Sequence, residues 1–514
     1  MKLFLLLTTL SPLHDGSDEV TYVDASLERE GELLGYHFVD VDQDDVLELV
    51  LVRRPETSPT RELSVHRITP RGVEVEPFWS LEVLDDAVAY GFADVREEPG
   101  RELLFLARRG VWSMSLDRVG YRDNLQPLIE HELLYDVPDP TSLRAWRYVF
   151  EGEAGDRLLL PGRASTSTFA PTEDRSYHLE TTFSETSADR TLGGSRSRGR
   201  EMTLSSSREV ASASDPLPWP FLAGTEAGSG DFLESERSLQ APTRLHVDRD
   251  GREDLVRRTA SGIAIHLQTE SGFRAEPDRV EEWPAYLEDD VVLELVDLDG
   301  DGDTDVVAVE DPDDGVDNEE IQVFALRNDG ARLLPEKPHQ VLRFEAAEIT
   351  VQCADIDGDG RVDLALRKFE MPSLLDAVSG LEFTLTHLLF RGEEGKRPFE
   401  RKPVVKTAET FDEKTFETVV KRRVWRLDCS GDGLADVVEI DLQGRISMRR
   451  LLVSKSFFGG ESWEIEATPW RRFPTTGNIE EVEVRDLNGD GLADVVSETG
   501  SALTILLSSR RGNR

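Results

Sequence analysis

The sequence predicts an all-β fold, a single closed β-propeller, and three observations lead to this prediction. A nine-residue acidic pattern, D-x-D-x-D-G-x-x-D, recurs along the 514-residue chain, and each copy runs into a short apolar segment. The first residues of successive copies lie 54, 54, 98, 51, 58, 73 and 58 residues apart. A repeat of roughly 40–50 residues or slightly more, with strands in every unit, is typical of propeller blades. A second segment in many units, such as 262–268 and 321–326, alternates apolar and polar residues as half-buried strands do.

Eight copies of the acidic pattern can be aligned. Four are nearly complete, at 297–305, 355–363, 428–436 and 486–494, and four degenerate copies lie at 40–48, 94–102, 148–156 and 246–254. The second position is apolar in every copy and is expected to be one structural site repeated in each blade: Val41, Val95, Val149, Val247, Leu298, Ile356, Cys429 and Leu487. We therefore expect eight blades. The alternative is seven blades, with the weak copy at 148–156 as a decorated hairpin.

The two ends of the chain are predicted to close the ring. The last unit stops about one strand short of a blade, whereas residues 19–27 form a strand-like segment ahead of the first acidic loop. We expect residues 19–27 to pair beside residues 501–508 and to supply the missing strand.

The residue types of the acidic loop indicate a bound calcium ion. No packing pattern requires three or four carboxylates within nine residues, whereas Ca²⁺ takes six to eight oxygen ligands in flexible geometry. Side chains at positions 1, 3 and 5 are expected to converge on the ion, and the glycine at position 6 permits a left-handed turn. The carbonyl of position 7 and the acid of position 9 would complete the ligand shell. Each ion is expected to brace its own blade.

The predicted ligands follow from this scheme. In the four strong loops they are Asp297, Asp299, Asp301, Asp303, Asp305, Asp355, Asp357, Asp359, Arg361, Asp363, Asp428, Ser430, Asp432, Leu434, Asp436, Asp486, Asn488, Asp490, Leu492 and Asp494, where position 7 contributes its carbonyl. In the degenerate loops they are Asp40, Asp42, Asp44 and Glu48, with Asp45 in place of the turn glycine, and Asp248, Asp250 and Asp254, where His246 is a poor ligand for a hard cation. The loops at 94–102 and 148–156 are expected to bind no metal. We therefore predict four to six Ca²⁺ ions.

An EF-hand shares the first half of this pattern but needs a glutamate at position 12 and flanking helices. Position 12 is Ala308, Leu366, Glu439 or Ser497 in the four strong copies, and an apolar strand-like segment follows each loop. The EF-hand is therefore rejected.

With these loops in place, the chain resembles the FG-GAP/VCBS-repeat β-propellers, the family that includes the head of the integrin α-subunit. The resemblance covers residues 20–510 apart from one insertion and rests on the calcium-loop half of the repeat, 297–305 and its equivalents. The Phe-Gly and Gly-Ala-Pro half is not visible, so the chain is more similar to the bacterial VCBS type. The resemblance implies that the calcium loops lie on the face opposite the main ligand surface.

Charge restricts the partners. The chain has 59 Lys and Arg against 102 Asp and Glu, a formal net charge of −43. Such a surface repels nucleic acid and anionic membranes, so we expect neither as a partner. Outside the N-terminus no apolar run approaches the ~20 residues that span a bilayer. We expect a monomer with no membrane insertion.

The chain is divided into a possible signal peptide at 1–18 and a propeller at 19–514, with a Ser/Thr/Gly-rich insertion at about 163–240. Within that insertion, the runs 176–183 and 201–205 are expected to form a protruding hairpin. A secreted, periplasmic or cell-surface location is predicted, because cytosolic Ca²⁺ is too scarce for weak sites. Cys353 and Cys429 are expected to be buried free thiols, with an interblade bridge as the alternative.

No nucleophile elbow, zinc-protease motif or phosphate-binding loop is present, so we predict a protein that is not an enzyme. Five tryptophans that could line a sugar-binding face are expected instead to be interblade core: Trp79, Trp112, Trp146, Trp283 and Trp425. The predicted function is a non-catalytic, calcium-binding propeller that binds an unknown protein or glycan in adhesion. The alternatives are a polysaccharide-cleaving lyase and a purely structural scaffold, because propellers carry unrelated functions.

Overall fold

The computed structural model describes residues 20–115, 125–131, 143–184, 204–206, 243–310, 318–372, 382–412 and 423–510. Within these ranges it leaves out residues 29–30, 45, 57, 59, 70, 98–99, 108, 147, 153, 162–164, 260–261, 288–290, 426, 442–443, 456–460, 475–478, 480 and 500–501. The predicted signal peptide at 1–18, Glu19 and Asp45 therefore lie outside the described residues. So does most of the predicted insertion at 163–240.

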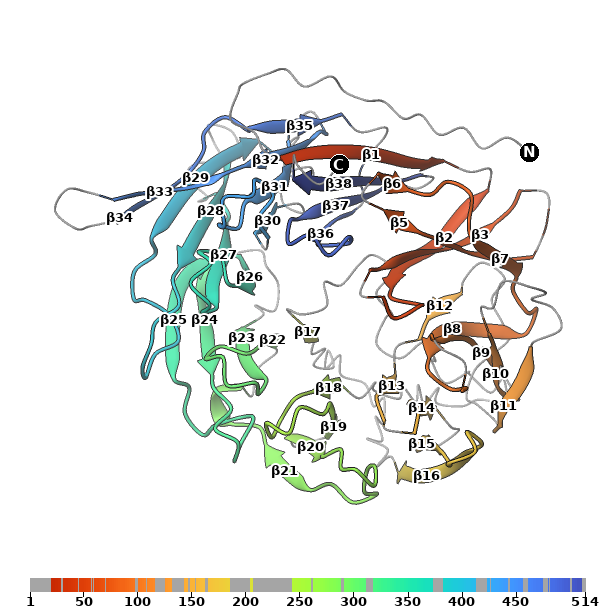
Figure 1. The fold of residues 1–514 in the computed structure, drawn as a ribbon. Coiled ribbons are helices and arrows are strands. Elements are labelled where there is room, and N and C mark those ends of the chain that lie inside the picture. Colours follow the sequence, from red (N-terminus) through yellow and green to blue (C-terminus); the bar gives the residue numbers. More distant parts are fainter. Residues whose placement is uncertain are drawn as a thin grey trace, which may run out of the picture.

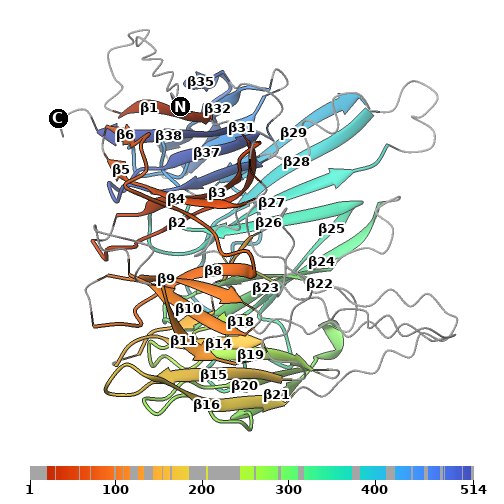
Figure 2. The ribbon, with the colours of Figure 1, turned by 90° about the vertical axis from the view of Figure 1, so that its right-hand side faces the viewer.

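The described residues form eight sheets of four or five strands, arranged as the blades of a ring (Figure 1). Figure 2 shows the same ring from the side. The prediction of an eight-bladed all-β propeller is confirmed, and the one short 3-10 helix among the described residues is η2 (Ala285–Leu287).

The first four blades follow the chain in order. Blade 1 contains β2 (Glu32–Val39), β3 (Glu48–Arg54), β4 (Glu62–His66) and β7 (Trp79–Glu82), with the small hairpin β5 (Ile68–Thr69) and β6 (Gly72–Val73). Blade 2 contains β8 (Ala87–Ala93), β9 (Glu102–Ala107), β10 (Gly110–Met114) and β11 (Gln126–Glu130). Blade 3 contains β13 (Val149–Phe150), β14 (Arg157–Pro161), β15 (Ser165–Pro171) and β16 (Tyr177–Ser184). Blade 4 contains β18 (Thr243–Leu245), β19 (Asp254–Thr259), β20 (Gly262–His266) and β21 (Arg279–Glu282).

The second half of the ring continues the pattern. Blade 5 contains β22 (Val291–Val296), β23 (Asp305–Glu310), β24 (Glu319–Leu326) and β25 (Gln340–Ala346). Blade 6 contains β26 (Glu348–Ala354), β27 (Asp363–Glu370), β28 (Glu382–Phe390) and β29 (Val405–Asp412). Blade 7 contains β30 (Arg423–Trp425), β31 (Val437–Ile440), β32 (Ile446–Arg449) and β35 (Arg471–Phe473), with the hairpin β33 (Leu451–Lys455) and β34 (Glu461–Ile465). Blade 8 contains β36 (Glu481–Arg485), β37 (Asp494–Thr499), β38 (Ala502–Arg510) and β1 (Val20–Glu28).

The predicted ring closure is confirmed. Strand β1 pairs antiparallel with β38 along its whole length, from Val20 opposite Arg510 to Glu28 opposite Ala502. The N-terminal strand therefore completes the blade that the C-terminal strands begin, which joins the two ends of the chain through backbone hydrogen bonds.

Two further strands add to the first strands of their blades. Strand β12 (Arg144–Ala145) pairs parallel with β8, and β17 (Leu204–Ser206) pairs parallel with β22. The hairpin predicted from residues 176–183 and 201–205 is wrong, because β16 is the fourth strand of blade 3 and β17 joins blade 5. Alternation alone cannot say which distant strand a segment will pair with.

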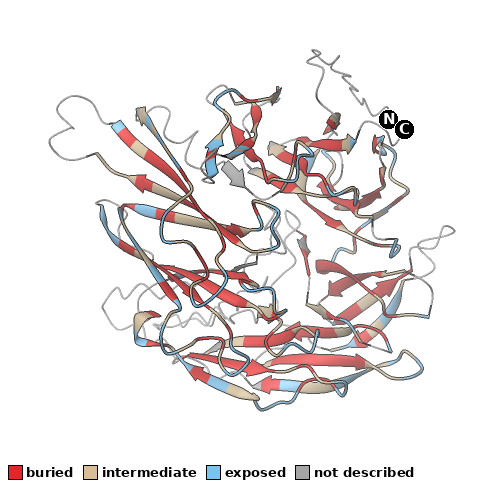
Figure 3. Cartoon of the chain, turned by 60° about the vertical axis from the view of Figure 1, so that its left-hand side comes forward, coloured by how far each residue is buried: buried red, intermediate tan, exposed pale blue. Residues whose placement is uncertain are grey.

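The hydrophobic core lies between neighbouring blades. Val50 and Val65 of blade 1 belong to one buried cluster with Phe92 and Phe105 of blade 2, and similar clusters follow around the ring. At the closure, Leu27 packs in a cluster with Leu49 and Leu51 of blade 1. Buried residues run along the strands, and exposed residues concentrate at strand ends and in loops (Figure 3). Because each apolar face is shared by two blades, the ring is held together by interblade burial.

The tryptophans belong to this core as predicted. Trp79 and Trp146 are buried, and Trp112 and Trp283 are partly buried against the same clusters. The side chain of Trp425 lies outside the described part of the chain. Both cysteines are buried and free, which confirms the thiol prediction and excludes the interblade bridge.

The acidic loops also join neighbouring blades, which the sequence did not predict. Each loop links the first two strands of its blade, and in four loops the N–H of the eighth position donates to the preceding blade's loop. The donors Arg101, Thr304, Ala435 and Ala493 reach the carbonyls of Val41, His246, Ile356 and Asp428 at 2.8, 2.6, 2.8 and 2.8 Å. These four loops therefore form backbone contacts between adjacent blades in addition to bracing their own.

A pair of glycines tests this contact. Gly358 and Gly300 both occupy position 4 of their loops with left-handed φ angles of 71° and 73°. A Cβ on Gly358 would lie 2.5 Å from the carbonyl oxygen of Gly433 in the next blade, whereas a Cβ on Gly300 would meet nothing within 4 Å. Both alanine variants carry the strain of a positive φ, but only Gly358→Ala must push two blades apart.

We expect Gly358→Ala to lower the melting temperature in EDTA by about 2–4 °C more than Gly300→Ala does. Scanning calorimetry of the two variants measures the difference. Equal melting temperatures would show that the contact between these loops does not contribute to stability.

Candidate metal centres

The acid at position 9 fastens each loop to its blade. In seven loops one of its carboxylate oxygens accepts the N–H of position 2 at 2.8–3.0 Å, in the pairs Val41–Glu48, Val95–Glu102, Val247–Asp254, Leu298–Asp305, Ile356–Asp363, Cys429–Asp436 and Leu487–Asp494. The position-2 side chains are buried, which explains why that position is apolar. The seven equivalent pairs show that these loops are fastened to their blades in the same way.

In four of the seven loops the other carboxylate oxygen reaches a residue near the end of the third strand of the blade, either within the strand, as for Ser508, or two residues beyond it. The N–H groups of Gln268, Asn328, Gly392 and Ser508 donate to it at 2.9, 2.6, 2.7 and 2.6 Å. One buried acid therefore ties together the loop and three strands of its blade. We call the bond from the position-2 N–H to the position-9 carboxylate, which all seven loops share, the position-9 staple.

The eighth copy does not share this arrangement, so the assignment of Val149 to the position-2 site is wrong. Val149 and Phe150 pair with Leu158 and Arg157, which leaves only a short turn between β13 and β14. Asp156 instead accepts the N–H of Asp94, in the loop of the preceding blade, at 2.8 Å. The distance in sequence between successive copies did not reveal the shorter loop, because the blade and its four strands are still present.

Backbone turns bring positions 1, 3 and 5 together. The position-1 aspartate accepts the N–H of the glycine at position 6, as in Asp297–Gly302 at 3.0 Å and Asp355–Gly360 at 3.0 Å. The position-5 aspartate accepts the N–H of position 7, as in Asp301–Asp303 at 3.0 Å. Position 4 is also left-handed in six loops, as glycine in the four strong copies and as Gln43 and Arg249 in two others. From the sequence, a left-handed residue is expected only at position 6.

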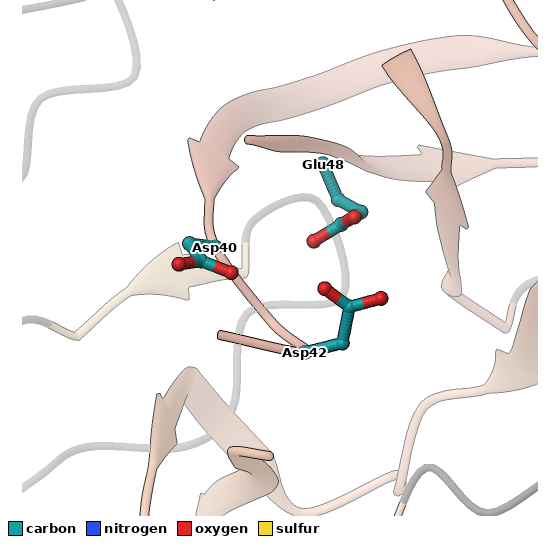
Figure 4. Close-up of side chains that lie close together, drawn as sticks. All are labelled: Asp40, Asp42 and Glu48. Atoms are coloured by element: carbon teal, nitrogen blue, oxygen red, sulfur yellow. The ribbon is translucent and has the colours of Figure 1, made fainter. Parts of the chain in front are cut away.

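Three groups of carboxylates lie close enough to hold one cation. They are Asp40, Asp42 and Glu48; Asp297, Asp299 and Asp305; and Asp355, Asp357 and Asp359, each with ligand atoms within 4.8 Å of one another. Figure 4 shows the first group, in which the carboxylates of Asp42 and Glu48 face each other. Oxygen-rich groups of this kind fit Ca²⁺, which accepts a flexible set of oxygen ligands. Among the described residues, position 9 enters two of the three groups.

The other two strong loops have fewer acids because position 3 is Ser430 or Asn488. Asn488 donates its side-chain N–H to the carbonyl of Ser508 at 3.0 Å, and its side-chain oxygen accepts the N–H of Asp490 at 3.0 Å. In the loop 428–436, Oδ1 of Asp436 is buried and has no hydrogen-bond partner in the described part of the chain. A buried carboxylate oxygen without a donor is an acceptor that a cation would satisfy.

The loop 246–254 places its acids less favourably. The ring Nδ1 of His246 lies 3.0 Å from the carbonyl oxygen of Arg252, so the histidine is engaged within its own loop. Asp250 pairs with Arg252 at 2.7 Å. The described acids of this loop do not form a group of three, which leaves Asp248, Asp250 and Asp254 as the weakest predicted site.

Arginines, most of them from distant positions in the chain, balance part of the loop charge, and the repeat pattern does not predict them. Arg249 bonds to the buried Asp303 at 2.9 Å and also to Asp301. Arg391 contacts Asp357 at 2.5 Å and Asp359 at 3.1 Å, and Arg361 contacts Asp359. Arg327 lies 3.7 Å from Asp299. A metal ion in these loops would therefore share its carboxylates with guanidinium groups.

Burial leaves the position-9 acids poorly compensated. It raises the pKa of Glu48, Glu102, Asp254, Asp305, Asp363, Asp436 and Asp494 to about 7, although backbone N–H bonds lower it in all seven. The pKa of Asp156 is raised to about 6 by the same cause. A bound cation would favour the ionised form of any of these acids that lies beside it.

Comparison with known proteins gives one family match. Residues 297–366, which contain two of the strong loops and the strands β23 to β26, match the model of an FG-GAP-like repeat. No curated protein matches the chain. A solved structure of an Agrocybe aegerita lectin, described as specifically recognising non-reducing terminal N-acetylglucosamine, is 15% identical with a TM-score of 0.32. That similarity covers 82% of this chain and 87% of the lectin chain.

Substitution of a position-3 acid tests the metal site in blade 5. In saturating calcium we expect Asp299→Asn to lower the melting temperature by about 2–4 °C, because a ligand that binds only the folded state then stabilises it less. In EDTA the change should be below about 1 °C, since the variant loses mainly a contact at 3.7 Å with Arg327. Glu336→Gln, at an exposed side chain outside the loops, is the control. A loss of equal size with and without calcium would remove Asp299 from the ligand set.

The staple can be tested by pH in a loop that is not expected to bind metal. The pKa of Glu102 is raised from 4.5 to about 7, so its proton stabilises the folded state below pH 4.5 and that stabilisation is lost as pH rises through about 7. Glu102→Gln keeps the group neutral. In EDTA we compare the melting temperatures of the variant and the natural protein at each pH. We expect the difference, variant minus natural protein, to increase by a few degrees between pH 5 and pH 8. Glu97→Gln, at an exposed neighbouring side chain, should give no such change. A melting-temperature difference for Glu102→Gln that stays constant with pH would contradict the protonation of the Glu102 carboxyl group in the folded state.

Proposed function

We propose that this chain, a β-propeller of the FG-GAP/VCBS family, is a non-catalytic calcium-binding protein that binds a protein or glycan outside the cell. The observation that carries the calcium part is the three groups of carboxylates within 4.8 Å, which lie at equivalent places in three different blades. Packing alone does not account for carboxylates gathered so closely, whereas a hard cation does.

Four to six ions per chain are proposed. The groups at Asp40, Asp297 and Asp355 supply three sites, and the loops 428–436 and 486–494 supply two more through their aspartates and the oxygens of Ser430 and Asn488. The loop 246–254 would provide a sixth, weaker site. When bound, each ion would neutralise the mutual repulsion of the acids around it, so that calcium and folding are coupled.

Residues of the chain itself hold the loops in place and orient the acids. The position-9 staple fastens seven loops to their blades, and in four of them the same acid also reaches the third strand. Left-handed turns at positions 4 and 6 bring positions 1, 3 and 5 together, and backbone contacts between loops join adjacent blades. These loops therefore brace the ring and leave other surfaces for a ligand.

An extracellular location follows from the calcium supply, because weak sites of this kind fill at the calcium concentrations found outside cells. Among the described residues, no helix is long and apolar enough to cross a bilayer. Export through residues 1–18 is part of the proposal.

Native mass spectrometry tests the proposed function directly. We expect four or more Ca²⁺ ions per chain, poor replacement by Mg²⁺, which demands octahedral geometry, and no release of unsaturated products from polysaccharides. A glycan array and a protein pull-down, each with calcium and with EDTA, measure ligand binding. Fewer than three ions, or depolymerisation of a polysaccharide, would contradict the proposal.

A further inference from the structure

An open cleft of about 870 Å³ lies between blades 5 and 6, which are neighbours in the ring (Figure 1). One wall is β25, the outermost strand of blade 5, and the other is formed by β27, β28 and the segment that leads into β29. Leu342, Phe344, Leu388, Phe390 and Pro403 contribute apolar surface. The volume is within the range of about 300–1,000 Å³ that small ligands occupy in protein pockets.

The cleft is cationic in a strongly acidic protein. Five of its lining side chains are lysine or arginine, against one acid, Glu370: Arg343, Lys368, Arg397, Arg401 and Lys406. The chain as a whole has 102 acids against 59 Lys and Arg. The local excess of positive charge is therefore opposite to the bulk charge, and an anionic ligand would be drawn to this place on the surface.

Two of these cations are available to a ligand. Lys368 pairs with Glu370 at 2.9 Å, Arg397 pairs with Glu393 at 3.3 Å, and Arg343 lies 3.7 Å from Glu320. Arg401 and Lys406 are exposed and make no ion pair with any residue that the structure describes. Both come from the segment around the start of β29, so their side chains extend from the same wall.

We propose that this interblade cleft binds a short stretch of an anionic polysaccharide bearing carboxylates, a polyuronate. Each uronate unit carries one carboxylate, which Arg401 and Lys406 would pair with, and an apolar ring face, which would pack on the apolar side chains of the cleft. Gln340 and Thr386 add neutral hydrogen-bonding groups to the lining. The proposal rests on the proposed binding function and names its site and ligand class.

The wall formed by β27 and β28 favours a glycan over an acidic peptide. Peptides that bind in extended form gain affinity from main-chain hydrogen bonds to a free strand edge. Strands β27 and β28 are paired on both sides, to β26 and β29 and to each other, so they offer side chains only. Strand β25 pairs only with β24 among the described strands, and binding of a peptide along its other edge is the outcome that poly-glutamate tests. A long, densely charged nucleic acid would also meet the repulsion of the surrounding acidic surface.

The experiment compares oligogalacturonates with neutral malto-oligosaccharides of the same length, poly-glutamate and single-stranded DNA. Binding is measured by calorimetry in saturating calcium at low and high salt. The test variant is Arg401→Glu with Lys406→Glu. The charge-matched control is Arg71→Glu with Arg472→Glu, at two exposed arginines outside the cleft. Thermal melting shows that both variants are folded.

We expect oligogalacturonate to bind, with affinity that falls as salt rises and decreases about tenfold or more in the cleft variant but not in the control. Equal binding by the cleft variant would place the ligand elsewhere and overturn the proposal. Stronger binding of poly-glutamate or DNA would overturn the ligand class. A neutral glycan or a protein as the sole ligand would overturn this inference while leaving the proposed function intact. Failure of every probe, of the glycan array and of the protein pull-down would instead contradict the proposed function.

Discussion

A buried carboxylate at the end of each acidic loop is the interaction on which this propeller depends. In seven blades it accepts the position-2 N–H at 2.8–3.0 Å, and in four of them it also accepts an N–H at or just past the end of the third strand. The staple is present even in the loop 94–102, where Arg96 replaces the acid at position 3. It is therefore a feature of the fold, and the proposed metal binding would be an addition made by the loops that also carry acids at positions 1, 3 and 5.

The gathered carboxylates repel one another, and nearby arginines together with a bound cation would offset that repulsion. Three carboxylates within 4.8 Å repel one another, and burial raises the pKa of Glu48 and Asp305 to about 7. Arginines such as Arg249 and Arg391 approach the loops from neighbouring segments and balance part of the charge. A calcium ion would supply the remainder, which would make the metal a stabiliser of the blades that hold it.

Much of the fold could be predicted from the sequence because its signals are local. The spacing of the loops indicated eight blades, the strand at 19–27 indicated the closure, and the apolar second position indicated a buried site. The signals that failed involve residues far apart in the chain. Arg249 meets Asp303 across 54 positions, the loop contact at Gly358 joins two blades, and the cleft combines β25 with β27 and β28. The short turn in blade 3 was missed because a repeat can shorten its loop while keeping its strands and its spacing.

The central claim is that the staple belongs to seven of the eight acidic loops, whether or not they hold metal, while calcium acts only where the acids converge. Hydrogen exchange at the amides of Val95 and Leu298, in calcium and in EDTA, tests it most directly, because both amides donate to a position-9 carboxylate. The account predicts slow exchange at both amides in EDTA and added protection by calcium at Leu298 alone. Fast exchange at Val95 in EDTA, or equal calcium protection at both amides, would contradict it.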